Sequence, residues 1–478
     1  MEFWGRQREL ARLRSELDEV RASGQGRMLV VRGRRQAGKS RLLTELVETA
    51  GIPYLYSTAF KNAPALAQVA QVAADMHTSR VPLPGLELAF AAQPTSWQDL
   101  FARLPLALDG QPAIVVLDEF AWATEADDTL EGVLQVAWDR TLERLPVLVV
   151  LVGSDLAMME RLTEHDRPLY GRAREMVVSA LSPAEVSEAF AGRIDPAGVF
   201  DMYLATGGYP RLVSAAQPHG SAGSFVVEQL QDDQSPLSIT GLRMLDAEFR
   251  DAEQARAVLE AIGAVEVGHA SFSSTVARLG GDDRSSGTAV SRALPALVDG
   301  KQVVAIDIPI GASTTSKLRR YRIVDPYLRF WFRYCRPHLA DMARGRADLA
   351  VGRFERDFTS WRGKAIEPVV HEAVSRLAAS DERLGGVERV GAWWDRSNAH
   401  EFDVVAAARD GSVPLMGSVK WRTRKPITSG EVAALANGRA VVPGAASARL
   451  LAVCPAGARD DAGAHVVLVA GDLLGAFR

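Results

Sequence analysis

The chain has 478 residues, a formal net charge of −4 at pH 7 and 47% hydrophobic residues, which is ordinary for a globular protein of roughly two to four domains. The longest apolar run, residues 147–152, is far too short to span a bilayer, and the first residues lack the pattern of a secretory signal. Because Cys335 and Cys454 are the only cysteines, we expect neither a disulfide framework nor a cysteine-based zinc site, and a reducing cytoplasm is the expected location.

Residues 33–40 read Gly-Arg-Arg-Gln-Ala-Gly-Lys-Ser, a complete phosphate-binding loop between an apolar run at 28–31 and a helix-patterned run that begins at Ser40. The glycines let backbone N–H groups surround phosphate oxygens at a helix N-terminus. We therefore predict binding of a nucleoside triphosphate, with Lys39 on the phosphates and the Ser40 hydroxyl on Mg²⁺. The predicted binding residues in this segment are Gly33, Arg34, Arg35, Gln36, Ala37, Gly38, Lys39, Ser40 and Arg41.

A second apolar run, residues 114–117, ends in Asp118 and Glu119. A strand in this position delivers Asp118 to the Mg²⁺ ion, and Glu119 can orient or deprotonate the attacking water. Strands often end in solvated acids, so the pair is a weak signal alone. Together with the phosphate loop it predicts hydrolysis as well as binding.

Three further residues are candidates for the transition state. A strand-like run over 147–153 ends at Ser154, which either contacts the γ-phosphate and the lytic water or caps the next helix. Arg172 and Arg174 lie in a loop-like stretch. Either one supplies positive charge to the transferring phosphate, in cis or from a neighbouring copy, or is a surface arginine. The predicted catalytic residues are Lys39, Asp118, Glu119, Ser154 and Arg172.

Other motifs accompany this site: Phe-Trp-Gly-Arg at 3–6, Val-Gly-Ser at 152–154 and Gly-Gly-Tyr-Pro-Arg at 207–211. With the loop and the acidic pair, they resemble the archaeal-type ATPase family, a branch of the AAA+/STAND P-loop proteins. The resemblance implies an α/β fold with a parallel sheet and a helical lid, and ATP and Mg²⁺ as ligands. It places Arg6 near the adenine and Arg211 in the lid as a second sensor.

Residues 236–335 follow the element order of a winged helix. Helical patterns cover 252–262, 272–279 and 286–297, with a break at 280–282, and two strand-like runs are joined by a polar loop at 311–317. Helix 286–297, which carries Arg292, holds the recognition-helix position. The domain either contacts DNA or only packs against the core or a protein partner.

A basic, aromatic segment follows. Between 311 and 346 we count nine basic residues against Asp325 and Asp341, which indicates either a nucleic-acid contact or a solvated face. The aromatic residues within 321–333 either stack on bases or anchor domain packing. This run resembles the start of an uncharacterised domain found behind such ATPases. The basic residues are Lys317, Arg319, Arg320, Arg322, Arg329, Arg333, Arg336, Arg344 and Arg346.

The last 140 or so residues combine a helix at 363–377, which places Glu367 and His371 on one face, with strand-like runs that carry Asp403 and Lys420. This order resembles the PD-(D/E)xK restriction-endonuclease-like fold. The resemblance implies that Asp403 and an acid two residues before Lys420 bind metal, with Glu367 as the helix acid. Lys420 would polarise water or phosphate.

The expected second acid is missing, because position 418 is a serine. A neutral hydroxyl is a poor substitute for a carboxylate as a metal ligand. Glu401 lies on the same strand face as Asp403, so its rescue of the site stays open. We predict a degenerate site made of Glu367, Asp403, Ser418 and Lys420, retained as a scaffold that binds nucleic acid or protein.

The predicted organisation is a P-loop domain with its lid (1–235), a winged helix (236–335) and a nuclease-like domain (336–478). The leading hypothesis is a cytoplasmic ATP-hydrolysing switch or motor that acts on DNA or a protein partner, not on a membrane, with oligomerisation left open. One alternative is a nucleotide-gated regulator with little turnover. Another is a metal-dependent DNA nuclease.

Overall fold

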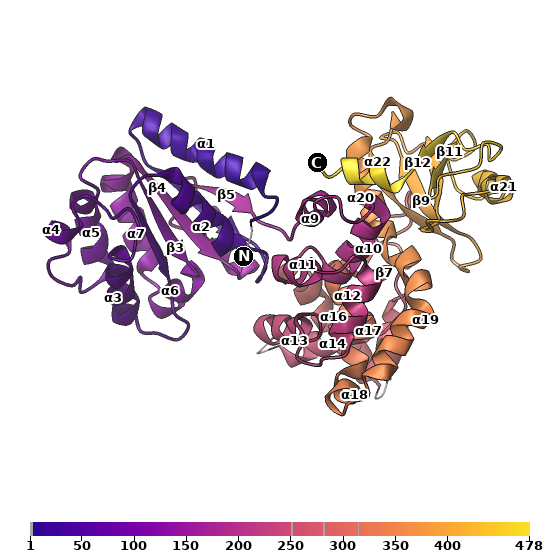
Figure 1. The fold of residues 1–478 in the computed structure, drawn as a ribbon, viewed down its shortest axis with the longest axis horizontal. Coiled ribbons are helices and arrows are strands. Elements are labelled where there is room, and N and C mark those ends of the chain that lie inside the picture. The colour runs from indigo at the N-terminus through magenta and orange to yellow at the C-terminus, as the bar shows by residue number, and fades with distance from the viewer. Residues whose placement is uncertain (1–2, 250–251, 281–282, 314) are drawn as a thin grey trace. The chain divides into compact units, whose positions relative to one another are not determined.

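The computed structural model describes residues 3–249, 252–280, 283–313 and 315–478. It contains two compact units, unit 1 (residues 1–180) and unit 2 (residues 181–478), and each is described by itself (Figure 1). The predicted boundary at 235 does not coincide with this division, because the helices that follow residue 181 pack with later parts of the chain. Among the helices of the described ranges, none combines the length and the apolar character that crossing a membrane requires.

Unit 1 is built on a parallel sheet with strand order β2-β3-β4-β1-β5. Its central strands are almost uninterrupted runs of valine, leucine and isoleucine, and β3 and β4 are buried along their whole length, as expected for a sheet covered on both faces. The carboxyl ends of all these strands meet at one edge, where α/β folds bind their ligands. The strands are β1 (Arg27–Arg32), β2 (Tyr54–Thr58), β3 (Ala113–Asp118), β4 (Val147–Gly153) and β5 (Ala173–Val177).

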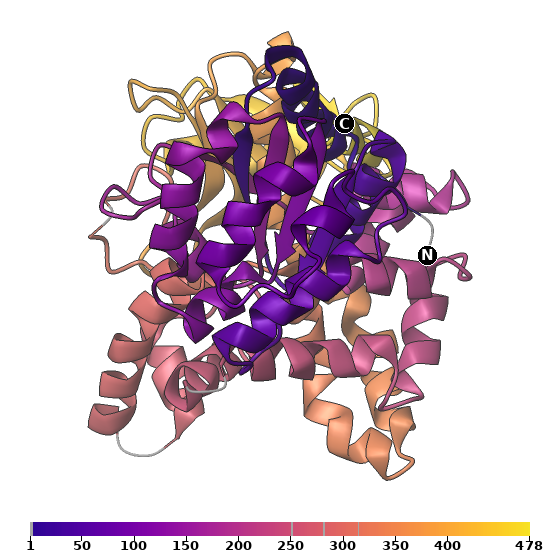
Figure 2. The same ribbon diagram turned by 90° about the vertical axis from the view of Figure 1, so that its left-hand side faces the viewer.

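Helices cover both faces of this sheet, as Figure 2 shows. On one face α1 and α2 bury leucines against Leu29, Val31 and Val150, and on the other α3, α5 and α7 bury residues such as Trp97 and Phe101. The helices of unit 1 are α1 (Gln7–Ser23), α2 (Lys39–Ala50), α3 (Ala65–Met76), α4 (Leu86–Ala89), α5 (Trp97–Leu108), α6 (Phe120–Ala126), α7 (Leu130–Arg140), the 3₁₀ segment η1 (Leu142–Arg144) and α8 (Leu156–Arg161).

The first part of unit 2 is helical and ends in an antiparallel hairpin, β6 with β7. Helices α14, α15 and α16 contact one another before that hairpin, in the predicted element order. Residues 281–282 of the predicted break and Thr314 of the predicted loop lie outside the described residues, and the winged helix stays a prediction. The elements are α9 (Pro183–Phe190), α10 (Pro196–Thr206), α11 (Pro210–Ala216), α12 (Ala222–Leu230), α13 (Pro236–Glu248), α14 (Glu253–Gly263), α15 (Phe272–Leu279), α16 (Asp283–Pro295), the π-helical η2 (Ala296–Gly300), β6 (Val304–Asp307) and β7 (Arg320–Ile323).

The aromatic segment forms helix α17 (Pro326–Tyr334), and its rings are buried. Trp331 packs on Gly241 of α13, and its indole N–H donates to the Ser238 carbonyl at 2.8 Å. The Tyr327 hydroxyl donates to the Leu237 carbonyl at 2.8 Å. The base-stacking interpretation is therefore wrong, because these rings are packing anchors with no exposed face to offer a base.

The basic run is not a continuous surface patch. Arg329 is buried at 5% exposure, and five other arginines of the run pair with carboxylates. Four of the five partners lie outside the segment counted from sequence. The pairs are Arg320 with Glu401, Arg322 with Asp307, Arg333 with Asp357, Arg336 with Glu260 and Arg346 with Asp348.

The end of unit 2 is a mixed sheet with order β12-β11-β10-β9-β8. Strands β8, β9 and β10 pair antiparallel, whereas β10, β11 and β12 run parallel. The elements are η3 (Arg336–His338), α18 (Leu339–Ala343), α19 (Ala347–Ala365), α20 (Glu367–Leu377), η4 (Glu382–Leu384), β8 (Arg389–Trp394), β9 (Glu401–Ala407), β10 (Leu415–Val419), α21 (Ser429–Asn437), η5 (Gly438–Ala440), β11 (Arg449–Val453), β12 (Val466–Leu468) and α22 (Ala470–Gly475).

Candidate nucleotide site and acidic cluster

The phosphate loop connects β1 to α2, which begins at Lys39. Gln36 and Gly38 adopt positive φ angles of 64° and 94°, a backbone curl that turns successive N–H groups toward one side and favours anions. Gly33 has a separate role. A Cβ at this position would lie 2.1 Å from the Val178 carbonyl oxygen, so only glycine allows this close approach.

Lys39 is buried within this loop, with 6% of its surface exposed. Its ammonium donates to the carbonyl oxygens of Gly33 at 2.7 Å and Arg34 at 3.1 Å. Burial lowers the pKa of Lys39 to about 8, although the nearby charges of Glu119 and Asp118 act in the opposite direction. The ammonium is thus held at the loop by weak neutral acceptors that a phosphate can replace.

The Ser40 hydroxyl donates to Asp118 Oδ2 at 2.7 Å, so the two predicted metal ligands meet at the carboxyl edge of the sheet. Tyr56 of β2 donates to the same oxygen at 2.8 Å. Burial and the charge of Asp118 raise the pKa of Tyr56, which stays a donor at neutral pH. Tyr56 was not predicted, and the available signal was its place two residues before the end of a strand adjacent to β3.

Glu119 stands at the start of α6 with a left-handed φ of 52°. Its carboxylate accepts from the Ser154 hydroxyl. Ser154 is not the helix cap, because the side chain of Asp155 accepts from the Met158 N–H and caps α8. The structure therefore brings Ser154 to the predicted water-positioning residue.

Arg6 is 3% exposed and directs its guanidinium to the phosphate loop. Nη2 donates to the Ala37 carbonyl at 2.6 Å and the Ser179 carbonyl at 2.5 Å, and Nη1 pairs with Glu9 at 3.0 Å. Buried carbonyls that receive such charge-assisted hydrogen bonds are strongly held. Arg6 thus fixes the backbone of the loop, and a contact with adenine stays a prediction.

Arg172 and Arg174 lie at the opposite edge of the sheet. Strand β5 is parallel to β1 and begins at Ala173, whereas the phosphate loop follows the carboxyl end of β1. Arg172 forms a bidentate pair with Asp139, at 2.7 and 2.8 Å, and Arg174 pairs with Glu16 at 2.9 Å. The structure thus corrects the prediction that Arg172 serves the phosphates of its own unit. Arg211 is an exposed residue of α11 in unit 2.

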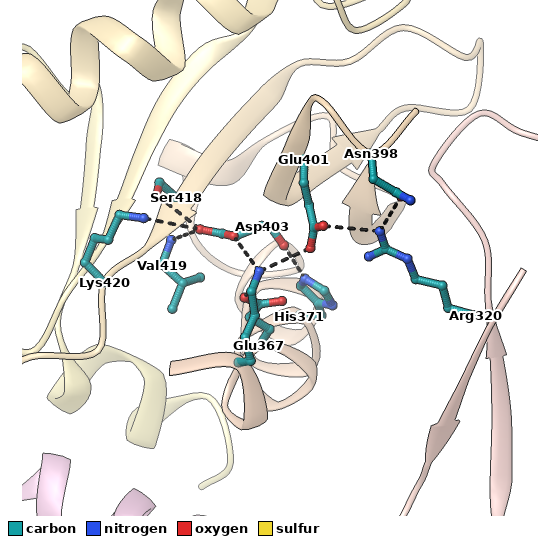
Figure 3. Close-up of polar contacts among 10 residues, drawn as sticks. Arg320, Glu367, His371, Asn398, Glu401, Asp403, Ser418, Val419 and Lys420 are labelled. Atoms are coloured by element: carbon teal, nitrogen blue, oxygen red, sulfur yellow. Dashed lines mark hydrogen bonds and ion pairs between the residues drawn. The ribbon is translucent and has the colours of Figure 1, made fainter. Parts of the chain in front are cut away.

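In unit 2 the residues of the predicted degenerate site lie together, as Figure 3 shows. Asp403 Oδ2 accepts from the Val419 N–H at 2.9 Å and from the Ser418 hydroxyl at 3.1 Å, and Lys420 Nζ lies 4.0 Å away. His371 Nε2 contacts the Asp403 carbonyl at 2.6 Å, which makes that nitrogen the donor. Ser418 therefore supports Asp403 as a neutral donor.

Sequence reasoning missed Lys364, whose ammonium contacts Glu367 at 3.0 Å, Glu401 at 3.1 Å and Asp403 at 3.5 Å. Burial alone would lower the pKa of Lys364, but the charges of Glu367 and Asp403 outweigh it and raise that pKa. Burial, followed by the charge of Asp403, raises the pKa of Glu367 to about 8. The spacing of Lys364 three residues before Glu367 was the signal available in the sequence.

Comparison with known proteins agrees with these two regions. Residues 2–150 match a family model described as an AAA ATPase domain, and residues 331–432 match one described as archaea bacterial proteins of unknown function. An uncharacterized protein of Methanocaldococcus jannaschii is 25% identical over 427 residues, 88% of each chain.

Solved structures also resemble the chain. The Walker-type ATPase of Pyrococcus abyssi has a TM-score of 0.49 and 18% identity, over 69% of this chain and 96% of that one. The ORC2 protein of Aeropyrum pernix has a TM-score of 0.42 and 14% identity, over 73% and 95%. By the two family matches, the chain carries an AAA ATPase domain followed by a C-terminal domain of a family whose function is unknown.

Proposed function

We propose that unit 1 hydrolyses ATP with Mg²⁺ and that the nucleotide state controls binding of a partner by unit 2. One observation carries this proposal: Ser40 with Asp118, and Ser154 with Glu119, meet beside Lys39 at the carboxyl edge of one sheet. These are the residue types that phosphoryl transfer needs for charge stabilisation and for placing water.

Each residue has a distinct part in the proposed reaction. The loop N–H groups and Lys39 bind the phosphates and stabilise the charge that spreads during transfer. Ser40 and Asp118 would hold Mg²⁺, which neutralises phosphate charge when bound, and Tyr56 orients the Asp118 carboxylate. Glu119 positions the attacking water and accepts its proton, while Ser154 keeps the carboxylate in place.

The experiment is a measurement of ATP turnover by the full chain and by Lys39→Ala and Glu119→Gln. Lys425→Ala is the matched control, because Lys425 is an exposed lysine of unit 2. We expect turnover to be lost in the first two variants and kept in the control. Equal rates in all four proteins would refute the ATPase proposal.

A second candidate, a nucleotide-gated regulator with little turnover, is favoured by the position of Arg172 and Arg174. With both at the opposite edge of the sheet, the described strands of unit 1 bring no arginine to the phosphates. Turnover that lacks such an arginine is slow by several orders of magnitude in related chemistry. Tight ATP binding with turnover that rises only when a partner or a second copy is added would support this candidate.

The partner is either DNA or a protein. The pairing of the arginines of residues 311–346 with carboxylates leaves little unpaired positive charge for phosphates and favours a protein. Binding of duplex DNA is measured with and without ATP as the salt concentration is varied. Steeply salt-dependent binding that changes with ATP supports DNA, and no binding at low salt leaves a protein partner.

A further inference from the structure

The acidic cluster of unit 2 already has a cation at its centre. Carboxylate oxygens of Glu367, Glu401 and Asp403 lie 3.0, 3.1 and 3.5 Å from the single nitrogen of Lys364. Carboxylates brought this close repel one another unless a positive charge lies between them. An ammonium group has three N–H donors, one for each of these oxygens.

Local structure favours this arrangement on both sides. Lys364 is in the last turn of α19, where the helix dipole favours a cation, and Glu367 opens α20, where it favours an anion. Glu401 and Asp403 alternate with Phe402 on β9 and so share one face of the strand. The backbone therefore directs the lysine and the carboxylates to one point.

The second oxygens of two of these carboxylates are also occupied. Asp403 Oδ2 accepts from Val419 and Ser418, and Glu401 Oε2 accepts from Arg320 Nη2 at 3.2 Å (Figure 3). Arg320 is itself held by stacking over Trp394, with its guanidinium carbon 4.2 Å from the ring centre. The carboxylates cannot rotate away from Lys364 without losing these partners.

A divalent ion does not fit this arrangement. Mg²⁺ requires oxygen ligands at about 2.0–2.1 Å in octahedral geometry, and the space between the carboxylates is filled by an ammonium. Position 418, where the resemblance asks for an acid, donates a hydrogen bond instead. In the part of the chain that the structure describes, no group of three or more His, Cys, Asp or Glu side chains is arranged to hold a metal ion.

We propose that Lys364 is a built-in cation that takes the place of a divalent metal in this cluster, so that unit 2 keeps the frame of a nuclease-like site without binding metal or cutting DNA. The ammonium neutralises the cluster permanently, and the domain becomes a scaffold whose stability is independent of divalent ions. This inference rests on unit 2 alone and stands or falls separately from ATP hydrolysis by unit 1.

The test is Mn²⁺ binding to the full chain without nucleotide, followed by the loss of the free-ion signal in electron paramagnetic resonance. The proteins are wild type, Asp403→Asn, Lys364→Met, Lys364→Met with Asp403→Asn, and the control Lys425→Met. Any Mn²⁺ bound in unit 1 is common to all and cancels. We expect Lys364→Met to bind about one more ion than wild type, and the double variant to lose it.

Two outcomes would overturn the proposal. One is a wild-type Mn²⁺ ion that disappears in Asp403→Asn, and the other is a folded Lys364→Met that gains no ion. Thermal unfolding gives an independent readout: added Mn²⁺ should raise the unfolding temperature of Lys364→Met but not that of Lys425→Met. If Lys364→Met does not fold, the comparison of wild type with Asp403→Asn decides, and equal Mn²⁺ binding by the two supports the proposal.

Discussion

The Ser154 hydroxyl lies 3.0 and 2.9 Å from the two carboxylate oxygens of Glu119. The two residues end neighbouring strands, β3 and β4, and so the sheet itself sets their separation. A hydrogen bond to a carboxylate restrains its rotation and is stronger than a bond between neutral groups. Ser154 is therefore placed to hold Glu119 in the one orientation that serves the attacking water.

We expect Glu119→Gln to lower kcat for ATP hydrolysis by roughly 10²–10⁴-fold, because an amide cannot accept the proton of water. Ser154→Ala should lower kcat by about tenfold, which corresponds to one charge-assisted hydrogen bond. ATP affinity should be kept in both variants. Steady-state turnover and equilibrium nucleotide binding check this, and a large loss of affinity would point to a binding role instead.

ATP binding should weaken as the pH rises above 8. Burial lowers the pKa of Lys39 to about 8 in the free protein, whereas phosphate charges raise it in the complex. The complex therefore binds more protons than the free protein between pH 8 and the ordinary lysine pKa of 10.5, and affinity falls up to about tenfold per pH unit there. Lys39→Arg, whose guanidinium stays charged, should show no such fall in equilibrium titrations.

Arg172→Ala should leave ATP turnover by dilute protein unchanged. Arg172 lies at the amino edge of the sheet and pairs with Asp139, and both side chains are partly exposed. Loss of such a pair costs at most about 1 kcal/mol of stability. Turnover measured over a range of protein concentrations checks this, since a decrease seen only at high concentration would show that Arg172 serves a neighbouring copy.

Gly241→Ala should destabilise unit 2 by about 1–3 kcal/mol or more. A Cβ at this position would lie 2.3 Å from the Trp331 ring, and both partners are buried inside the helical region. Gly223→Ala in α12 is the matched control, because its Cβ would meet only Ser221 Oγ at 3.8 Å. Denaturant unfolding followed by tryptophan fluorescence distinguishes the two, and equal stability would mean that α17 is not a packing anchor.

The sequence was most informative where one short segment carries both a strand and its functional residue. The phosphate loop, Asp118 and Ser154 were found because apolar runs marked the strand ends. Strand β5 was missed because it reads Ala-Arg-Glu-Met-Val, an edge strand with little apolar signal. Without that strand, Arg172 looked like a loop residue free to reach the phosphates.

Contacts between distant segments were the part that could not be predicted. Tyr56 and Lys364 reach their carboxylates from other elements, so no local pattern marks them as site residues. The basic run failed for the same reason, since partners such as Asp357 and Glu260 lie outside the counted segment. Net charge along a sequence measures composition, whereas binding of nucleic acid depends on charge left unpaired after folding.

Arg6 joins two points of the backbone that are far apart in sequence, Ala37 in the phosphate loop and Ser179 just before the end of unit 1. The Val178 carbonyl also packs against Gly33, and its N–H donates to the Arg32 carbonyl at 2.8 Å. The loop that would grip a phosphate and the segment by which the chain leaves unit 1 are thus fastened to each other. Any shift of the loop on nucleotide exchange pulls directly on the connection to the rest of the polypeptide.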